Sequence, residues 1–291
     1  MSEIRTVGVC GAGTMGAGIA IVAARAGHRV VLYDTHDSSL ERARRQTEGF
    51  FGKSVERGKM TREQADAALA ACSTTGFLAD LAECDIVIEA VFENLEVKRS
   101  LFAQLNEICP ARTILASNTS TLSITEIAGG CGREDRVVGM HFCLPAQLMK
   151  LVEMSPGLNT SDETFRSAWA FCEAMGQRPV RTQDTPGFVL NYFLVPFNND
   201  AIRLIEAGVA EPADVDRAIK AGLGYKMGPC ELLDLIGLDT QVLLCEAFYG
   251  VTHDPRCAAP PLLKRMVAAG HLGRKSGRGF FTYDRDAMFG G

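Results

Sequence analysis

The sequence predicts an α/β fold with a mostly parallel sheet, followed by an all-α C-terminal domain. Short β-branched runs alternate with helical stretches over residues 6–181, and near-continuous apolar strands of this kind are typical of a parallel sheet covered on both faces. From residue 186 to about residue 270 only helical periodicity remains, with Gly and Pro between the segments. The alternation of strand and helix patterns ends near residues 182–187, so the predicted domains are residues 1–183 and 184–291.

The expected elements of the first domain follow one another in simple alternation. The predicted strands are residues 6–10, 29–33, 85–90, 113–116, 136–141 and 178–181, and the predicted helices are residues 14–26, 38–57, 61–71, 95–108 and 162–175. A further strand candidate, residues 148–154, follows Pro145 with no helix in between. We therefore expect it to run antiparallel to the strand before it.

The C-terminal domain is predicted to contain helices over residues 188–207, 212–221, 231–249 and 261–269. Pro186 follows two good N-cap residues and indicates the start of the first of them. Residues 188–197 and 232–244 offer more apolar helical surface than a small bundle requires. Dimerisation through this domain is one explanation, and packing in the core explains the same residues equally well.

Composition and charge narrow the classes of function. The 291 residues include 30 Lys and Arg against 35 Asp and Glu, a formal net charge of −5, so neither nucleic acid nor an anionic membrane surface is expected as the main partner. The sequence lacks a signal-peptide pattern and any apolar run long enough to span a bilayer, which favours a soluble cytoplasmic protein. The ten cysteines are scattered without metal-ligand spacing, and we expect buried thiols and no metal site.

The most informative local stretch joins the first strand to the first helix. It reads Gly11-Ala12-Gly13-Thr14-Met15-Gly16, the G-x-G-x-x-G spacing of a Rossmann-type dinucleotide-binding fold. Gly11 permits the tight turn, Gly13 lets the backbone approach a pyrophosphate, and Gly16 allows close packing of helix and strand. The next strand ends in Asp34, an acid that suits the ribose 2′-hydroxyl of NAD and repels the 2′-phosphate of NADP. NAD is the predicted cofactor, with FAD or a glycine turn that binds nothing as alternatives.

His141, at the end of a predicted strand, is the best candidate for a catalytic base. Dehydrogenation of an alcohol needs a group that takes the hydroxyl proton, and an imidazole does so near neutral pH. A histidine that is only hydrogen-bonded at a strand end is the alternative. Glu153 lies in an apolar run where a lone carboxylate is costly, so His141 is a plausible partner. A tight hairpin about Pro145 would place His141 opposite Met149 instead.

Several motifs occur in a fixed order that resembles the L-3-hydroxyacyl-CoA dehydrogenases, and in particular the bacterial 3-hydroxybutyryl-CoA dehydrogenases. They are the glycine loop, Ser117-Asn118-Thr119-Ser120, His141-Phe142, Met149-Lys150-Leu151-Val152-Glu153, Asp184-Thr185-Pro186-Gly187-Phe188 with Asn191, Tyr225-Lys226-Met227-Gly228-Pro229, and a closing Gly-Arg-Lys-Ser-Gly-Arg-Gly-Phe over residues 273–280. The resemblance runs essentially from end to end. It implies an enzyme of fatty acid metabolism that oxidises a short L-3-hydroxyacyl-CoA to the 3-oxoacyl-CoA, reversibly and with NAD.

The resemblance also implies roles for individual residues. The histidine at position 141 is the general base and Glu153 holds it, while Ser120 and Asn191 hydrogen-bond the substrate at its 3-oxygen and reacting centre. Because Asn191 belongs to the second domain, the site is expected in the cleft between the domains. The positions implied to help hold the dinucleotide, besides the glycine loop and Asp34, are Glu93, Lys98, Ser120 and Lys275.

Two features bear on the substrate. Lys53 and Arg57, one turn apart near the end of a predicted helix, are candidates for binding the phosphates of coenzyme A, with a solvated helix face as the alternative. The family's motif His-Phe-x-Asn-Pro here reads His141-Phe142-Cys143-Leu144-Pro145, and Leu144 cannot make the hydrogen bonds of the family's asparagine near the nicotinamide. The competing hypotheses are a dehydrogenase of a non-CoA hydroxy acid and a catalytically idle NAD-binding protein.

Overall fold

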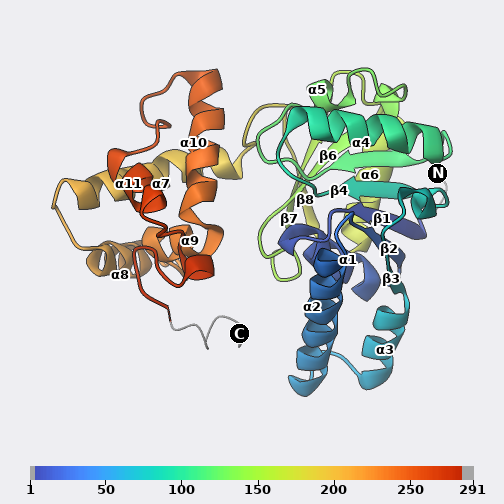
Figure 1. Ribbon diagram of the computed structural model, residues 1–291, viewed down its shortest axis with the longest axis horizontal. Helices are drawn as coiled ribbons and strands as arrows, with labels where there is room; N and C mark the ends of the chain where they lie inside the picture. The colour runs from blue at the N-terminus through green and yellow to red at the C-terminus, as the bar shows by residue number, and fades with distance from the viewer. Residues whose placement is uncertain (1–3, 284–291) are drawn as a thin grey trace. The chain divides into compact units, whose positions relative to one another are not determined.

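The computed structural model describes residues 4–283 and divides the chain into two compact units, one ending at Thr185 and one beginning at Pro186 (Figure 1). The first unit is a sheet covered by helices, and the second is helical. The predicted fold class, a Rossmann-type sheet followed by an all-α region, is confirmed.

Within residues 4–283, the first unit contains one eight-stranded sheet in the order β3-β2-β1-β4-β5-β6-β7-β8. All neighbouring strands are parallel except β6 and β7, which confirms the antiparallel strand expected after Pro145. The strands are β1 (Thr6–Cys10), β2 (Arg29–Tyr33), β3 (Cys72–Thr75), β4 (Ile86–Glu89), β5 (Ile114–Ser117), β6 (Val137–Phe142), β7 (Leu151–Pro156) and β8 (Arg178–Arg181).

The central strands are buried because helices cover both faces of the sheet. In β4, Ile86 and Ile88 pack toward one core cluster and Val87 toward another, as the two-residue period of a strand requires. The edge strand β3 was not among the predicted strands. Its sequence, Cys-Ser-Thr-Thr, is half-exposed and polar, so it lacks the apolar signal that marked the others.

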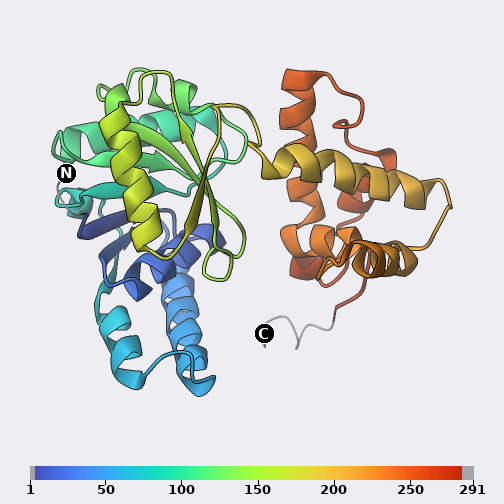
Figure 2. The same ribbon diagram turned by 180° about the vertical axis from the view of Figure 1, so that it is seen from behind.

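Two layers of helices flank the sheet (Figures 1 and 2). Residues from α1, α2, α3 and α6 pack in the core on one face, and those from α4 and α5 pack on the other. Side chains cap several helix starts, such as Asn94 Oδ1, which accepts from the backbone N–H of Val97 at 3.1 Å. The helices are α1 (Thr14–Arg25), α2 (Asp37–Glu56), α3 (Arg62–Ala70), α4 (Leu95–Ile108), α5 (Ile124–Ala128) and α6 (Asp162–Ala174), with 3-10 turns η1 (Leu78–Leu81) and η2 (Glu134–Arg136).

The second unit differs from prediction at two helix boundaries. The first helix begins at Leu190 rather than near Pro186, because Gly187 and Phe188 have φ of +75° and +51° and form a turn. The expected helix over residues 231–249 is two helices, separated at Gly237, where φ is +100°. The elements are α7 (Leu190–Glu206), α8 (Pro212–Leu223), α9 (Pro229–Ile236), α10 (Leu238–Thr252), α11 (Pro261–Ala268) and the 3-10 turn η3 (Arg274–Ser276).

One buried carboxylate of α9 fastens residues 280–283 to the helices of the second unit. Asp234 accepts hydrogen bonds from the backbone N–H groups of Phe280 and Phe281, both at 2.9 Å, and from the Tyr283 hydroxyl at 3.0 Å.

All ten cysteines of the chain are free thiols, and nine are buried. Among residues 4–283, none of the helices combines the length and apolarity required to cross a bilayer.

Candidate active site

The glycine loop connects β1 to α1 at the carboxyl edge of the sheet, where open α/β sheets bind ligands. Gly11 has a φ of +99°, and a Cβ there would lie 2.6 Å from the Ala90 carbonyl oxygen. A Cβ on Gly16 would lie 1.7 Å from the Gly11 carbonyl oxygen, so only glycine allows this turn and this packing. A Cβ on Gly13 would meet no protein atom within 4 Å, so protein packing does not require that glycine. The open space beside Gly13 leaves its backbone accessible to a ligand, and the loop fits a dinucleotide pyrophosphate at the helix N-terminus.

Asp34 lies directly beside this loop. Its Oδ2 accepts from the Ala12 backbone N–H at 2.8 Å, and its Oδ1 accepts from the His36 backbone N–H at 2.9 Å. The side chain is 16% exposed. One carboxylate therefore ties the end of β2 to the glycine loop, a structural role that the sequence analysis did not anticipate.

His141 and Glu153 form a buried hydrogen-bonded pair across β6 and β7. The register of the two strands sets His141 opposite Glu153, and His141 Nδ1 lies 2.8 Å from Glu153 Oε2. The alternative pairing with Met149 is wrong, because the chain makes a longer connection between the strands instead of a tight hairpin. His141 Nε2 lies 3.0 Å from Ser120 Oγ. A carboxylate only accepts hydrogen bonds, so Nδ1 carries a proton, and in the neutral imidazole Nε2 presents its lone pair toward Ser120.

The loop after β5 is fastened to β6 next to this pair. Asn118 Oδ1 accepts from the Phe142 backbone N–H at 2.8 Å. Asp184 holds the segment beyond Ser120, accepting from the backbone N–H groups of Ile124 at 2.7 Å and Thr125 at 2.9 Å. The sequence analysis gave Asn118 no role and expected Asp184 only as a cap of the following helix, but the cap of α7 is Val189 and the Asp184 carboxylate binds residues 123–125 instead.

Glu89, Glu93 and Lys98 form a second polar cluster at the carboxyl end of β4. Lys98 Nζ lies 2.6 Å from Glu89 Oε1 and 3.1 Å from Glu93 Oε2, and the Lys98 side chain is only 1% exposed. Burial raises the pKa of Glu89 more than Lys98 and Ser117 lower it. Burial also opposes ionisation of Glu93, but Lys98 and hydrogen bonds from Thr119 and Ser120 outweigh it and lower that pKa. Glu89 was not among the predicted site residues.

The remaining predicted residues belong to the second unit or to the end of α2. Asn191 is a half-buried residue in the first turn of α7, and Lys275 lies in η3, where its Nζ is 2.6 Å from Asp239 Oδ1. Both belong to the second unit. Lys53 and Arg57 lie at the end of α2, with Arg57 exposed.

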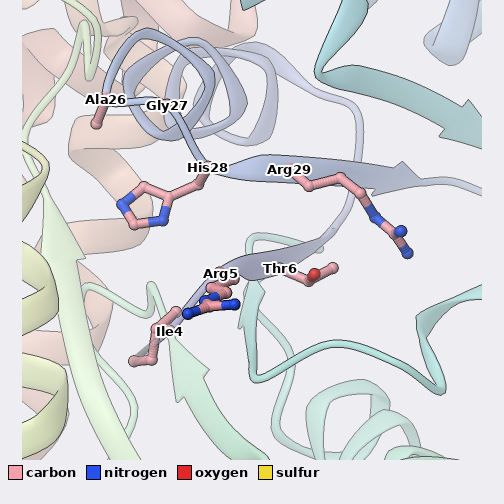
Figure 3. Close-up of a pocket in the computed structure, with 7 residues that line it drawn as sticks. All are labelled: Ile4, Arg5, Thr6, Ala26, Gly27, His28 and Arg29. Atoms are coloured by element: carbon pink, nitrogen blue, oxygen red, sulfur yellow. The ribbon is translucent and has the colours of Figure 1, made fainter. Parts of the chain in front are cut away.

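A pocket at the opposite edge of the sheet is not part of this site (Figure 3). It is lined by Ile4, Arg5, Thr6, Ala26, Gly27, His28 and Arg29, at the amino ends of β1 and β2. The strands therefore separate it from the glycine loop and His141. Among the residues that the structure describes, no group of three or more His, Cys, Asp and Glu side chains is placed to hold a metal ion.

The chain is similar to known proteins over almost its whole length. The chain is 43% identical to a probable 3-hydroxybutyryl-CoA dehydrogenase of Bacillus subtilis, over 97% of this chain and 98% of that protein. Its fold matches a crystal structure of FadB2 from Mycobacterium tuberculosis with a TM-score of 0.94 at 41% identity, covering 97% of this chain and all of that one. It also matches (S)-3-hydroxybutyryl-CoA dehydrogenase from Ralstonia eutropha with a TM-score of 0.90 at 39% identity, with the same coverage.

Two family models together account for nearly the whole chain. The NAD binding domain of 3-hydroxyacyl-CoA dehydrogenase matches residues 6–185, and the C-terminal domain of the same family matches residues 187–283. The first match identifies NAD as the cofactor, as the glycine loop and Asp34 predicted. The chain therefore belongs to the 3-hydroxyacyl-CoA dehydrogenase family.

Proposed function

We propose that the protein oxidises a short-chain L-3-hydroxyacyl-CoA, such as 3-hydroxybutyryl-CoA, to the 3-oxoacyl-CoA, and catalyses the reverse reaction. The observation that carries this proposal is the chain of contacts Glu153–His141–Ser120 at the carboxyl edge of the NAD-binding sheet, with distances of 2.8 and 3.0 Å. Such a chain can accept a proton at one nitrogen of the imidazole and stabilise the resulting charge at the other.

Each residue of the chain of contacts has a defined task in this reaction. His141 Nε2 takes the proton of the substrate hydroxyl, and Glu153 stabilises the imidazolium that forms. Bound NAD supplies the hydride acceptor. Ser120 Oγ, already a partner of Nε2, hydrogen-bonds the substrate 3-oxygen and fixes the distance over which the proton moves. In reduction, the imidazolium returns the proton to that oxygen.

The preference for NAD over NADP is assigned to Asp34. A ribose 2′-hydroxyl can donate to its carboxylate, whereas a 2′-phosphate would be repelled by it. Asp34→Ala is expected to lower the NAD-to-NADP ratio of kcat/KM, and an unchanged ratio would remove Asp34 from this role. Because Asp34 also accepts from the Ala12 N–H, the affinity for both dinucleotides is expected to fall as well.

The nature of the substrate is tested by an NADH assay across 3-oxoacyl-CoA esters of increasing chain length and the corresponding free acids. Saturation by the short CoA esters alone supports the proposal. Saturation by the free acids indicates a dehydrogenase of hydroxy acids instead. Tight NAD binding without turnover of any of these compounds indicates an idle NAD-binding protein, in keeping with Leu144 at the position of the family's asparagine.

Four residues outside the contact chain are assigned to ligands on the basis of the family resemblance. Asn191 is proposed to bind the substrate near its reacting centre, and Lys275 to contribute to the dinucleotide site. Lys53 and Arg57 are proposed to bind the coenzyme A phosphates. Replacing both by alanine is expected to raise KM for the CoA ester and to leave KM for NADH unchanged, and equal changes in both constants would contradict that assignment.

A homodimer formed through the helical unit is proposed from its exposed apolar side chains. Tyr192 and Phe193 on α7 and Leu243 and Val251 on α10 are each more than 60% exposed. A measured mass of two chains by light scattering, reduced to one by Phe193→Glu and Leu243→Glu together, is the expected result. A cytoplasmic location and a role in fatty acid metabolism are also proposed, to be tested by cell fractionation and by growth of a deletion strain on fatty acids.

A further inference from the structure

A single carboxylate oxygen organises the loop that carries Ser120. Glu93 Oε1 accepts from the backbone N–H of Ser120 at 2.9 Å and from that of Thr121 at 3.0 Å. The same oxygen accepts from the hydroxyls of Thr119 at 2.5 Å and Thr121 at 3.0 Å. The backbone on both sides of the serine side chain is therefore fixed from one point, which sets the direction in which Ser120 Oγ points.

The other oxygen of Glu93 is anchored in the core. Glu93 Oε2 lies 3.1 Å from Lys98 Nζ, which in turn donates to Glu89 Oε1 at 2.6 Å. Glu89 Oε2 accepts from Ser117 Oγ at 2.7 Å, in the last residue of β5. The polar chain thus begins and ends on the segment that includes Ser120, and its inner members, Glu89 and Lys98, are 0% and 1% exposed.

The burial of Lys98 decides how this cluster can act. Its ammonium is enclosed between two carboxylates, and an ammonium has only three donors and no acceptor. Any influence of Lys98 on bound ligands therefore passes through Glu93, whose side chain is 35% exposed. Charge-assisted hydrogen bonds of this kind are short and directional, and they suit the orientation of a neighbouring group.

We propose that Glu93, held by the Lys98–Glu89 pair, is a positioning residue that aims Ser120 Oγ at His141 Nε2. This inference deepens the proposed function and rests on it. Glu93 acts on His141 indirectly, because Glu93 fixes the Ser120 backbone and Ser120 Oγ contacts the imidazole at 3.0 Å. A misplaced serine lengthens that contact and alters the environment in which His141 takes up its proton.

Glu93→Gln is the most direct variant, because an amide has one oxygen where the carboxylate has two. That oxygen can face Lys98 or the N–H groups of the loop, but not both. The matched control is Glu96→Gln, three residues later in the first turn of α4, since the Glu96 side chain is 82% exposed and makes a loose ion pair with Arg99 at 3.8 Å. We expect Glu93→Gln to lower kcat by about 10- to 100-fold, with a change in KM for NAD of less than about threefold. A rise in KM for NAD at unchanged kcat would show direct dinucleotide binding instead and overturn the proposal.

A measurement on His141 itself separates this inference from the proposed reaction. The pH titration of its imidazole nitrogens can be followed by NMR in the ligand-free wild type, Ser120→Ala, Glu93→Gln and Glu96→Gln. We expect Ser120→Ala and Glu93→Gln to move the midpoint in the same direction, and Glu96→Gln to leave it in place. If Glu93→Gln leaves the midpoint unmoved, the positioning role is wrong, whatever substrate the enzyme turns over. If the midpoint moves as expected and no 3-hydroxyacyl-CoA is oxidised, the proposed function fails and the positioning of Ser120 stands.

Discussion

Glu89 and Glu153 are buried carboxylates of the same sheet, and each binds one nitrogen-bearing side chain at short distance. Glu89 holds Lys98 at 2.6 Å, and Glu153 holds His141 at 2.8 Å. They differ in what the partner can do next. The Lys98 ammonium only donates, and it lies between the carboxylates of Glu89 and Glu93. The His141 imidazole uses one nitrogen for Glu153 and the other for Ser120.

A buried carboxylate paired with a nitrogen-bearing side chain therefore has two different uses in this sheet. A buried carboxylate needs a compensating partner in either case, because an unpaired charge in the core is very costly. With a purely donating partner, the pair fixes the geometry of a loop. With an imidazole partner, whose second nitrogen contacts Ser120 Oγ at the edge of the sheet, the same arrangement can move a proton.

The largest effect is expected at the imidazole. His141→Ala should lower kcat by about 10²- to 10⁴-fold, because that is the usual contribution of a general base. NAD affinity should change little, since His141 lies on β6 whereas the glycine loop that fits the pyrophosphate joins β1 to α1. Steady-state kinetics and NAD titration measure both quantities. His271→Ala, in the loop after α11, is a suitable control, and near-wild-type turnover in His141→Ala would remove the residue from its proposed role.

At Lys98 the main expected effect is a loss of stability, whereas at His141 it is a loss of turnover. Lys98→Met should lower the free energy of unfolding by about 3–5 kcal/mol, because it leaves Glu89 and Glu93 without their buried counter-charge. Urea unfolding followed by circular dichroism measures this loss. Adding Glu89→Leu to Lys98→Met should restore much of the stability, because the buried carboxylate is then gone as well. A double variant no more stable than the single one would contradict the account of a compensated ion pair.

The His141–Glu153 and Lys98–Glu89 pairs also show which parts of the site could be predicted from the sequence alone. His141 was identified from its place at a strand end, and Glu153 from the cost of a carboxylate in an apolar run. The Glu89–Lys98 pair was missed, because it joins a strand to a helix at a spacing that matches neither a strand nor a helix period. The His141–Glu153 contact itself stayed open, since it depends on the length and path of the connection between β6 and β7.

Other parts of the fold show the same limit. The parallel strands with apolar runs were predicted because burial on both faces leaves a clear pattern, whereas the polar edge strand β3 left none. The break at Gly237 within an otherwise periodic helical stretch depends on a backbone φ of +100°, and a single glycine does not reveal its φ. Local pattern therefore predicts elements, and tertiary contacts decide their ends and partners.

The carboxylate of the catalytic pair is expected to matter for chemistry more than for stability. Glu153→Gln keeps the shape of the side chain, but its amide can donate to Nδ1 and turn the proton of the imidazole to Nε2, the nitrogen that must accept. We expect kcat to fall by about 10²-fold, equivalent to about 2.7 kcal/mol, with a smaller change in the free energy of unfolding. Parallel kinetic and urea measurements test this, and a variant that loses stability at unchanged kcat would contradict it.

The smallest expected effect is on the pH dependence of the free energy of unfolding. It distinguishes Glu93 from Glu89, the two carboxylates that contact Lys98. The pKa of Glu93 is lowered in the folded protein, because Lys98 and the loop N–H groups outweigh its burial. Its ionisation therefore adds stability above the ordinary glutamate pKa of 4.5, and this is lost as the pH falls through the lowered value. Since Glu93 is about a third exposed, the contribution is expected to stay within about 1 kcal/mol.

Glu89 should behave with the opposite sign. Burial raises its pKa, so the folded protein binds this proton more tightly than the unfolded chain, and stability is gained as the pH falls through the raised value toward 4.5. The stability difference between wild type and Glu93→Gln should thus shrink toward acid pH, while that between wild type and Glu89→Gln should move in favour of the wild type. Urea unfolding in a series of buffers from neutral to acid pH measures both differences. If both stability differences changed with pH in the same direction, Glu89 and Glu93 would have their pKa values shifted in the same direction. That result would contradict the assignment of the lowered pKa, and of the carboxylate charge beside the Ser120 loop, to Glu93.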